Sequence, residues 1–208
     1  MKKYDSIIFD LDGTLWSSLE SAVRAMADVK SRYEDIKYDT TSDDVKSAMG
    51  LTFDEARKFY YGYLSDEKSY KYTKEAFERN VEYLSKGEGK LYPDVVETLD
   101  VLSKNYKLFI VSNCALEYIR IFFKTCGLEK YFLDYECGGT NGFSKAENIK
   151  MIIERNGLNS PVYVGDTIHD KEASRKAGVP FIYASYGFGD VSEYDYKIDK
   201  FKNLSNLF

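Results

Sequence analysis

Apolar residues along the first 85 positions follow two successive patterns. Residues 4–9 form a short, nearly continuous apolar run that ends at Asp10, which is typical of a buried strand. The apolar side chains then recur at helical spacing in three stripes, at 15–33, 53–64 and 70–84. We therefore expect one strand, followed by a helical stretch over about 15–85 that contains no strand.

Beyond Gly87 and Gly89 the pattern changes to an alternation of strands and helices. Short apolar runs predict strands at 108–111, 133–137, 162–164 and 181–184. The segments between them have helical spacing. Pro93 and Asp94 are expected in the first turn of one helix, and further helices start near Ala115, Ser144 and Thr167. Two of these starts are capping-box signatures, Ser144 with Glu147 and Thr167 with Asp170. The residues after 184 are predicted to be irregular.

This order of elements indicates an α/β protein. Strands separated by helices form a parallel sheet with helices on both faces. The helical stretch interrupts that alternation directly after the first strand, so it is expected to be an inserted cap. We predict a discontinuous catalytic core of residues 1–14 and 88–208, and an α-helical cap domain of residues 15–87.

Composition and charge exclude several classes of function. The 208 residues carry 29 Lys and Arg against 34 Asp and Glu, a formal net charge of −5, which argues against a generally basic nucleic-acid binder. No run approaches the ~18 apolar residues of a membrane helix, and the start lacks a signal peptide. The odd number of cysteines and the absence of a CxxC pair predict reduced thiols in the cytoplasm and no zinc site. From the charge and the short apolar runs we expect no nucleic-acid and no membrane partner.

Polar residues gather where the predicted strands end, which is where ligands bind in open parallel sheets. They are Asp10 and Asp12, Ser112 and Asn113, Asp166 and Asp170, together with Lys145 at a helix start. Crowded carboxylates repel one another, and oxygen ligands favour Mg²⁺. A carboxylate can act as a nucleophile, a second one as acid and base, and a hydroxyl with a lysine can hold a phosphate. The set therefore suits phosphoryl transfer.

Four segments of the chain resemble the motifs of the haloacid dehalogenase-like superfamily of phosphotransferases, in the same order. They are Asp10-Leu11-Asp12-Gly13-Thr14, the strand-ending Ser112, the helix-opening Lys145, and Gly165-Asp166-Thr167-Ile168-His169-Asp170. A helical insert between the first two motifs is similar to the members with an α-helical cap. In its motifs and helical insert the chain most resembles the phosphoglycolate phosphatase and β-phosphoglucomutase group.

The resemblance implies a role for each motif residue. Asp10 is the nucleophile and a metal ligand, and Asp12 is the general acid and base, with its backbone carbonyl also on the metal. Asp166 and Asp170 are metal ligands, and the cofactor is Mg²⁺. Ser112, Lys145 and the backbone beside Leu11 and Asn113 hold the phosphate. The carboxylate at Asp12 favours phosphate esters, because the dehalogenase and phosphonatase members lack it.

Simpler roles exist for several of these residues. The aspartates could be turn or capping residues, Lys145 a solvated surface charge, and Ser112 a helix cap. Trp16 stands at the entry to the cap, where it either packs or shapes substrate access. The segment Gly50-Leu51-Thr52 resembles the loop with which family members probe the leaving group. His169 and Cys114 lie near the motifs, and their role stays open.

The expected function is a Mg²⁺-dependent phosphatase that acts on a small phosphorylated metabolite through a phosphoaspartate. One alternative is a phosphomutase, in which a sugar hydroxyl instead of water receives the phosphate. Another, from a different class, is a non-catalytic binding module on the same fold. The partner is a small molecule, and the sequence leaves open whether the chain is a monomer or a homodimer.

Overall fold

A computed structural model describes residues 3–208. Within them, six strands form one sheet with the order β5-β4-β1-β6-β7-β8, and every neighbouring pair is parallel. The strands are β1 (Ser6–Phe9), β4 (Lys107–Ser112), β5 (Asp134–Cys137), β6 (Pro161–Gly165), β7 (Phe181–Ala184) and β8 (Tyr196–Ile198). The predicted α/β class with a parallel sheet is confirmed.

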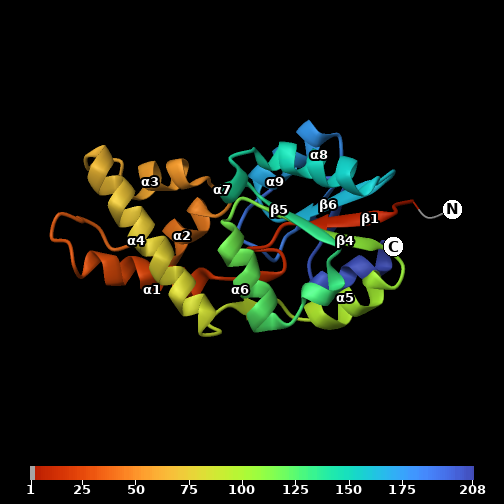
Figure 1. Cartoon of the computed structure of the whole chain (residues 1–208), viewed down its shortest axis with the longest axis horizontal. Coiled ribbons are helices and arrows are strands. Elements are labelled where there is room, and N and C mark those ends of the chain that lie inside the picture. Colours follow the sequence, from red (N-terminus) through yellow and green to blue (C-terminus); the bar gives the residue numbers. More distant parts are fainter. Residues whose placement is uncertain (1–2) are drawn as a thin grey trace.

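Helices cover both faces of this sheet (Figure 1). One face packs against α5 (Val95–Ser103), α6 (Leu116–Cys126) and the 3₁₀ helix η2 (Phe201–Asn206). The other packs against α8 (Lys145–Asn156) and α9 (Ile168–Ala177). A short 3₁₀ helix, η1 (Glu129–Tyr131), and the four-residue α7 (Gly138–Asn141) flank β5.

The central strand explains why its sequence is apolar at consecutive positions. Ile7 and Phe9 point into the core beneath one face, while Ile8 belongs to the core on the opposite face. All three side chains are fully buried. A strand covered on both faces has no solvent-facing side, so it shows a continuous apolar run instead of an alternation.

Four helices lie between the first strand and the remainder of the sheet in sequence. They are α1 (Leu19–Lys30), α2 (Ser42–Ala48), α3 (Phe53–Tyr61) and α4 (Asp66–Ser85). Figure 1 shows them gathered at one end of the molecule, away from the start of β1. Met26, Val29, Tyr61 and Tyr72 belong to a small apolar core of their own. The proposed boundaries of the cap domain, 15–87, stay a prediction.

The expectation that 15–85 contains no strand is wrong at its beginning. Trp16–Ser17 forms a short strand, β2, which pairs antiparallel with β3 (Lys90–Leu91), and the first helix begins only at Leu19. A two-residue strand is too short to show periodicity. In the sequence the neighbouring apolar residue Leu15 therefore fits the helical stripe that follows. This two-stranded ladder pairs the segment that leads into the helical insert with the segment that leads out of it.

Two further expectations about secondary structure are wrong. The segment after 184 is not wholly irregular, because it contains β8 and η2, whose residues Ile198 and Phe201 are buried. Asp94 does not lie in the first turn of its helix. It is the residue before that turn and has a left-handed backbone with φ of 65°. Both capping boxes, at Ser144 and at Thr167, are confirmed.

Candidate active site

The three central strands bring the predicted motifs together. β1 is hydrogen-bonded to β4 on one side and to β6 on the other, and all three run in the same direction. Their carboxyl ends therefore place Asp10, Ser112 and Asp166 side by side at one edge of the sheet. Asp170 and Lys145 join them from the first turns of α9 and α8.

Three carboxylates form the centre of this site. Oxygen atoms of Asp10, Asp166 and Asp170 lie within 4.8 Å of one another, and the three residues are at most 5% exposed. The ammonium group of Lys145 donates to Oδ1 of Asp10 at 2.8 Å and to Oδ1 of Asp170 at 2.6 Å. When ionised, the three carboxylates exceed the one ammonium by two negative charges.

The pKa values at this centre reflect that excess of negative charge. Burial raises the pKa of Asp10 to about 7, with Lys145 opposing the shift and Asp170 adding to it. Burial, followed by repulsion from Asp170 and Asp10, raises the pKa of Asp166 well above its usual value. Burial acts in the same direction on Asp170, but Lys145 and Thr167 hold the pKa of that carboxyl below its usual value. Two of the three carboxyl groups thus resist ionisation unless a cation compensates them.

A hard divalent cation fits this donor set. The candidate ligands are all carboxylate oxygens, the preferred ligands of Mg²⁺, and the excess charge matches one divalent ion. Asp166 is fixed for such a role by Thr14, which donates to its Oδ1 at 3.2 Å, and by the Phe188 N–H, which donates to its Oδ2 at 2.8 Å. The carboxylate of Asp12 lies outside this group.

The side chain of Asp170 has two functions. Its Oδ2 accepts from the N–H and the hydroxyl of Thr167, at 2.9 and 2.6 Å, which completes the capping box of α9. Its Oδ1 accepts from Lys145 and from the hydroxyl of the buried Tyr163, at 3.2 Å. The capping role and a place in the carboxylate group therefore coexist in one residue.

Asp12 has a separate environment. Its Oδ1 accepts from the N–H of Ser18 at 3.0 Å, and its Oδ2 accepts from the Ser18 hydroxyl at 2.6 Å and from the hydroxyl of Tyr118. Burial raises the pKa of Asp12, while these donors oppose the shift. The two aspartates of the first motif are thus held by different partners.

The remaining predicted residues occupy different positions around the site. Ser112 is buried at the end of β4, and its hydroxyl accepts weakly from the N–H of Cys114 at 3.4 Å. The side-chain amide of Asn113 donates to the carbonyl of Gly50 at 2.9 Å, which connects the loop after β4 to the helical insert. Leu51 is partly buried, and Thr52 is the N-cap of α3.

Trp16 is fully buried and belongs to the apolar core beneath the sheet. Its indole packs edge-to-face on Tyr118, with ring centroids 5.4 Å apart, and on Phe122 at 5.2 Å. A fully buried ring offers no wall to a substrate, so its position favours the packing role. Burial also raises the pKa of Cys114, which makes that thiol a poor nucleophile.

A groove of about 490 Å³ opens between the helical insert and the sheet. It is lined by residues of α2, by Thr167 and His169 at the start of α9, and by the loop 188–190. Because Thr167 and Phe188 also contact the carboxylate group, this groove lies directly beside the candidate site.

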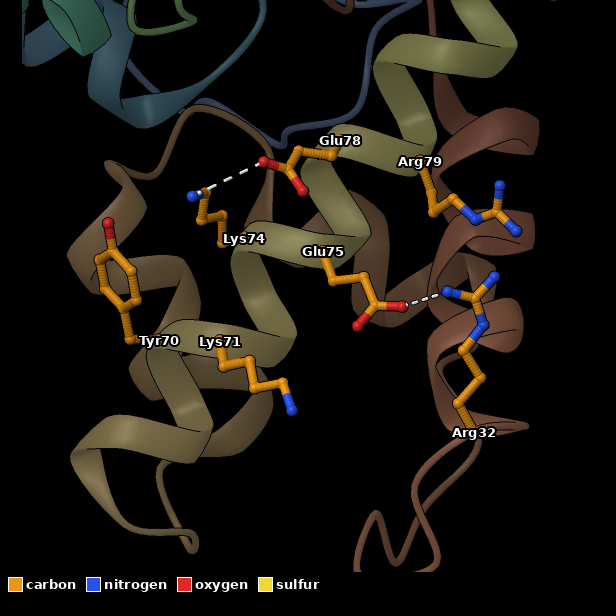
Figure 2. A pocket seen from close by; sticks show the side chains of 7 residues that line it. All are labelled: Arg32, Tyr70, Lys71, Lys74, Glu75, Glu78 and Arg79. Carbon is orange, nitrogen blue, oxygen red and sulfur yellow. Dashed lines mark hydrogen bonds and ion pairs between the residues drawn. The ribbon is translucent and has the colours of Figure 1, made fainter.

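A second groove, of about 620 Å³, is lined by residues of α4 and by Arg32, which follows α1 (Figure 2). Two ion pairs lie within it, Arg32 with Glu75 and Lys74 with Glu78 at 3.7 Å (Figure 2). The groove includes none of the predicted site residues. We assign it no part in the chemistry.

Several residues at the site could not be predicted from the sequence. Ser18 lies six positions after Asp12, beyond β2 and directly before α1, so proximity in sequence is its only signal. Tyr118 and Tyr163 contact site carboxylates from a helix and a strand that are distant in sequence. Both aromatic rings fit the apolar pattern of their elements, which concealed the hydroxyl groups that they bring to the site.

Comparison with known proteins identifies the family. The model of the family described as haloacid dehalogenase-like hydrolase matches residues 7–184. That range contains all four motifs and most of the chain. The chain belongs to the haloacid dehalogenase-like hydrolase family.

Individual relatives agree with this assignment. A phosphoglycolate phosphatase of Agrobacterium fabrum is 36% identical over 128 residues, which cover 57% of this chain and 55% of that protein. A phosphoglycolate phosphatase of Aliivibrio fischeri is 27% identical over 95% of this chain and 93% of its own length. A solved haloacid dehalogenase-like hydrolase of Streptococcus pneumoniae has the same fold, with a TM-score of 0.88 at 20% identity and 100% coverage of both chains.

The expected family and the expected class of enzyme, a hydrolase of the phosphatase type, are thus confirmed. A family model shared with hydrolases does not assign a role to any single residue. Across residues 3–208, no helix combines the length and the apolar character needed to cross a membrane.

Proposed function

We propose that this chain is a Mg²⁺-dependent phosphatase that hydrolyses a small phosphorylated metabolite through a phosphoaspartate on Asp10. The observation that carries the proposal is the buried group of three carboxylates around one lysine, beside a second carboxylate that is held apart. A nucleophile, a cation site and an acid–base group are the parts that this chemistry needs. The cytoplasm as its location stays a prediction.

The first half of the reaction transfers the phosphoryl group to the enzyme. A carboxylate oxygen of Asp10 attacks the phosphorus, and the bond between phosphorus and the alcohol oxygen breaks. Asp12 gives its proton to that oxygen, so the alcohol leaves neutral. The raised pKa of Asp12 favours the protonated form that this step requires.

The second half returns the enzyme to its starting state. Water attacks the phosphorus of the phosphoaspartate, and the carboxylate of Asp12 takes a proton from it. The bond between phosphorus and the Asp10 oxygen breaks, and inorganic phosphate leaves. Ser112 and Lys145 hold the phosphoryl oxygens in both halves. Bound Mg²⁺ supplies a Lewis acid that screens the negative charge of phosphate and carboxylates.

The helical insert is the part that selects the substrate in this proposal. Residues 15–87 act as a cap, and the loop from Gly50 to Thr52, which directly follows the groove-lining Met49, meets the leaving group. The bond between Asn113 and Gly50 supports this role, because it joins that loop to the phosphate side of the site. A closed cap excludes bulk water while the groups react.

Phosphate release from a panel of phosphoesters, with Mg²⁺ and with a chelator, tests this function. The curated relatives are named for phosphoglycolate, so 2-phosphoglycolate is the first substrate of the panel. We expect Mg²⁺-dependent release by the wild type and none by Asp10→Asn. Release that survives Asp10→Asn would reject the nucleophile, and a chain inert toward the whole panel would reject the phosphatase.

A further inference from the structure

Two hydroxyl groups converge on a single oxygen of Asp12. Oδ2 accepts from the hydroxyl of Ser18, at 2.6 Å, and from the hydroxyl of Tyr118. Oδ1 accepts only from the backbone N–H of Ser18, at 3.0 Å, among the contacts of the described residues. Since each oxygen has its own donors, the carboxyl plane cannot rotate without losing hydrogen bonds.

The side chain of Tyr118 is buried, and its orientation is set by packing against neighbouring rings. The residue is 8% exposed and lies near the start of α6. Its ring meets the indole of Trp16 edge-to-face at an interplanar angle of 83°, and Trp16 in turn packs on Phe122. In a close-packed interior such a ring has one favourable orientation.

The indole itself has little freedom to move. Trp16 is fully buried, and a Cβ built at Gly89 would lie 2.3 Å from its Cζ3 atom. Only a glycine at position 89 leaves room for the large ring. The backbone of Gly89 therefore contacts the indole, the indole contacts the ring of Tyr118, and the Tyr118 hydroxyl meets the carboxyl group of Asp12.

We propose that Tyr118 is a positioning residue for the acid–base carboxyl group of Asp12, with Trp16 as the support that fixes its ring. This inference rests on the proposed function. With two hydroxyl donors on Oδ2, the transferable proton belongs on Oδ1. Tyr118 thus determines which oxygen acts and holds that oxygen in a fixed direction.

A positioned acid has a kinetic signature that a merely structural residue lacks. Protonation of the leaving oxygen matters greatly for an alkyl phosphate, whose alkoxide is a poor leaving group. It matters little for p-nitrophenyl phosphate, whose phenolate leaves without help. General acid catalysis contributes about 10²–10⁴-fold to rate, and misplacing the acid removes part of that factor.

The test compares Tyr118→Phe with the wild type on these two kinds of substrate. The alkyl substrate is 2-phosphoglycolate, or the fastest alkyl phosphate of the panel if that compound is not hydrolysed. We expect kcat/KM for the alkyl phosphate to fall about ten-fold or more, because kcat/KM reports the steps up to phosphoryl transfer and excludes the later water step, which is the same for both substrates. With p-nitrophenyl phosphate, kcat/KM should stay within about two-fold of the wild type.

The chain offers a matched control for this substitution. Tyr72 is 4% exposed, and its hydroxyl donates to a carboxylate, Oδ1 of Asp35, at 3.0 Å. Tyr72→Phe removes the same kind of bond from the helical insert, so kcat should stay unchanged on both substrates. Trp16→Phe is the second variant, since it leaves the hydroxyl in place but loosens its support. Trp16→Phe should lower kcat/KM for the alkyl phosphate selectively, but by less than Tyr118→Phe does. If Tyr118→Phe does not fold, Trp16→Phe becomes the variant that tests the inference.

Two results would overturn the inference in distinguishable ways. Equal losses of kcat/KM on both substrates, or no change in kcat/KM on either, would make Tyr118 and Trp16 structural residues only, while the proposed function would stand. A wild type that releases no phosphate from either substrate with Mg²⁺ would reject the proposed function, and the inference would fall with it.

Discussion

The ammonium nitrogen of Lys145 lies 2.8 Å from Oδ1 of Asp10, and both residues are only 5% exposed. Burial alone would favour a neutral lysine, but Asp10 and Asp170 together raise its pKa above the usual value. The lysine is therefore a fixed positive charge at the centre of the site. Two of the four motifs meet in this contact although they are 135 positions apart.

Removing that charge should destabilise the protein strongly. Lys145→Met leaves Asp10 and Asp170 buried without their cation, and breaking a buried ion pair costs about 3–5 kcal/mol. Urea unfolding with a chelator present measures this loss. The control is Lys104→Met, whose pair with Asp100 is solvent-exposed, and it should leave the unfolding midpoint unchanged. Equal midpoints for the two variants would contradict the account.

Gly13 is required by close contact as well as by its backbone. A Cβ there would lie 2.2 Å from Oδ2 of Asp166, and its φ is 91°. Gly13→Ala should displace the Asp166 carboxylate and reduce turnover by about ten-fold or more, as small misplacements in active sites do. Gly87 has a similar φ of 85° but nothing within 4 Å, so Gly87→Ala carries only the backbone strain. Initial rates that fall equally in both variants would show that the contact is unimportant.

Mg²⁺ should stabilise the folded protein through the carboxylate group. A ligand at about 100 times its Kd adds roughly 2.7 kcal/mol to the free energy of unfolding, which a thermal melt detects. We expect Mg²⁺ to raise the Tm of the wild type and to have little effect on Asp166→Asn. Asp100→Asn, a substitution on the exposed face of α5, should keep the full response. A wild-type Tm that is the same in Mg²⁺ and in chelator would argue against a metal at this group.

The bond between Asn113 and Gly50 should hold the loop 50–52 against the sheet. Asn113→Ala removes the side-chain amide that donates to the carbonyl of Gly50. Amide hydrogen exchange at 50–52 should become faster, and KM should rise. Asn80→Ala, which breaks a bond with Ser21 inside the helical insert, should not alter exchange at 50–52. Unchanged exchange in Asn113→Ala would mean that the loop is held by packing alone.

The sheet was predictable because its strands are buried on both faces and bounded by clear signals. Consecutive apolar residues around Ile7 and Val164, and the capping boxes at Ser144 and Thr167, each predict an element locally. The pairing of Trp16–Ser17 with Lys90–Leu91 and the strand at Tyr196–Ile198 could not be predicted in this way. They are two and three residues long, and their formation depends on partners distant in sequence.

In the candidate site, too, some residues have a signal in the sequence and others depend on partners distant in sequence. Charged motif residues such as Asp10 and Lys145 could be predicted, because they stand at a strand end and a helix start in the order and spacing of the family's motifs. Tyr118 and Tyr163 do not stand out, since each serves as an apolar core residue by its ring and as a donor by its hydroxyl. Only the folded structure reveals which carboxylate each hydroxyl meets.

The most direct test of the central claim is to locate the phosphoryl group on the enzyme during turnover. The protein is mixed with Mg²⁺ and p-nitrophenyl phosphate, whose leaving group needs no acid, and is then quenched in acid, digested and analysed by tandem mass spectrometry. We predict a phosphate adduct on Asp10 that accumulates further in Asp12→Asn, where the water step lacks its base, and that is missing from Asp10→Asn. Full turnover by Asp10→Asn, or an adduct on a different residue, would contradict the account.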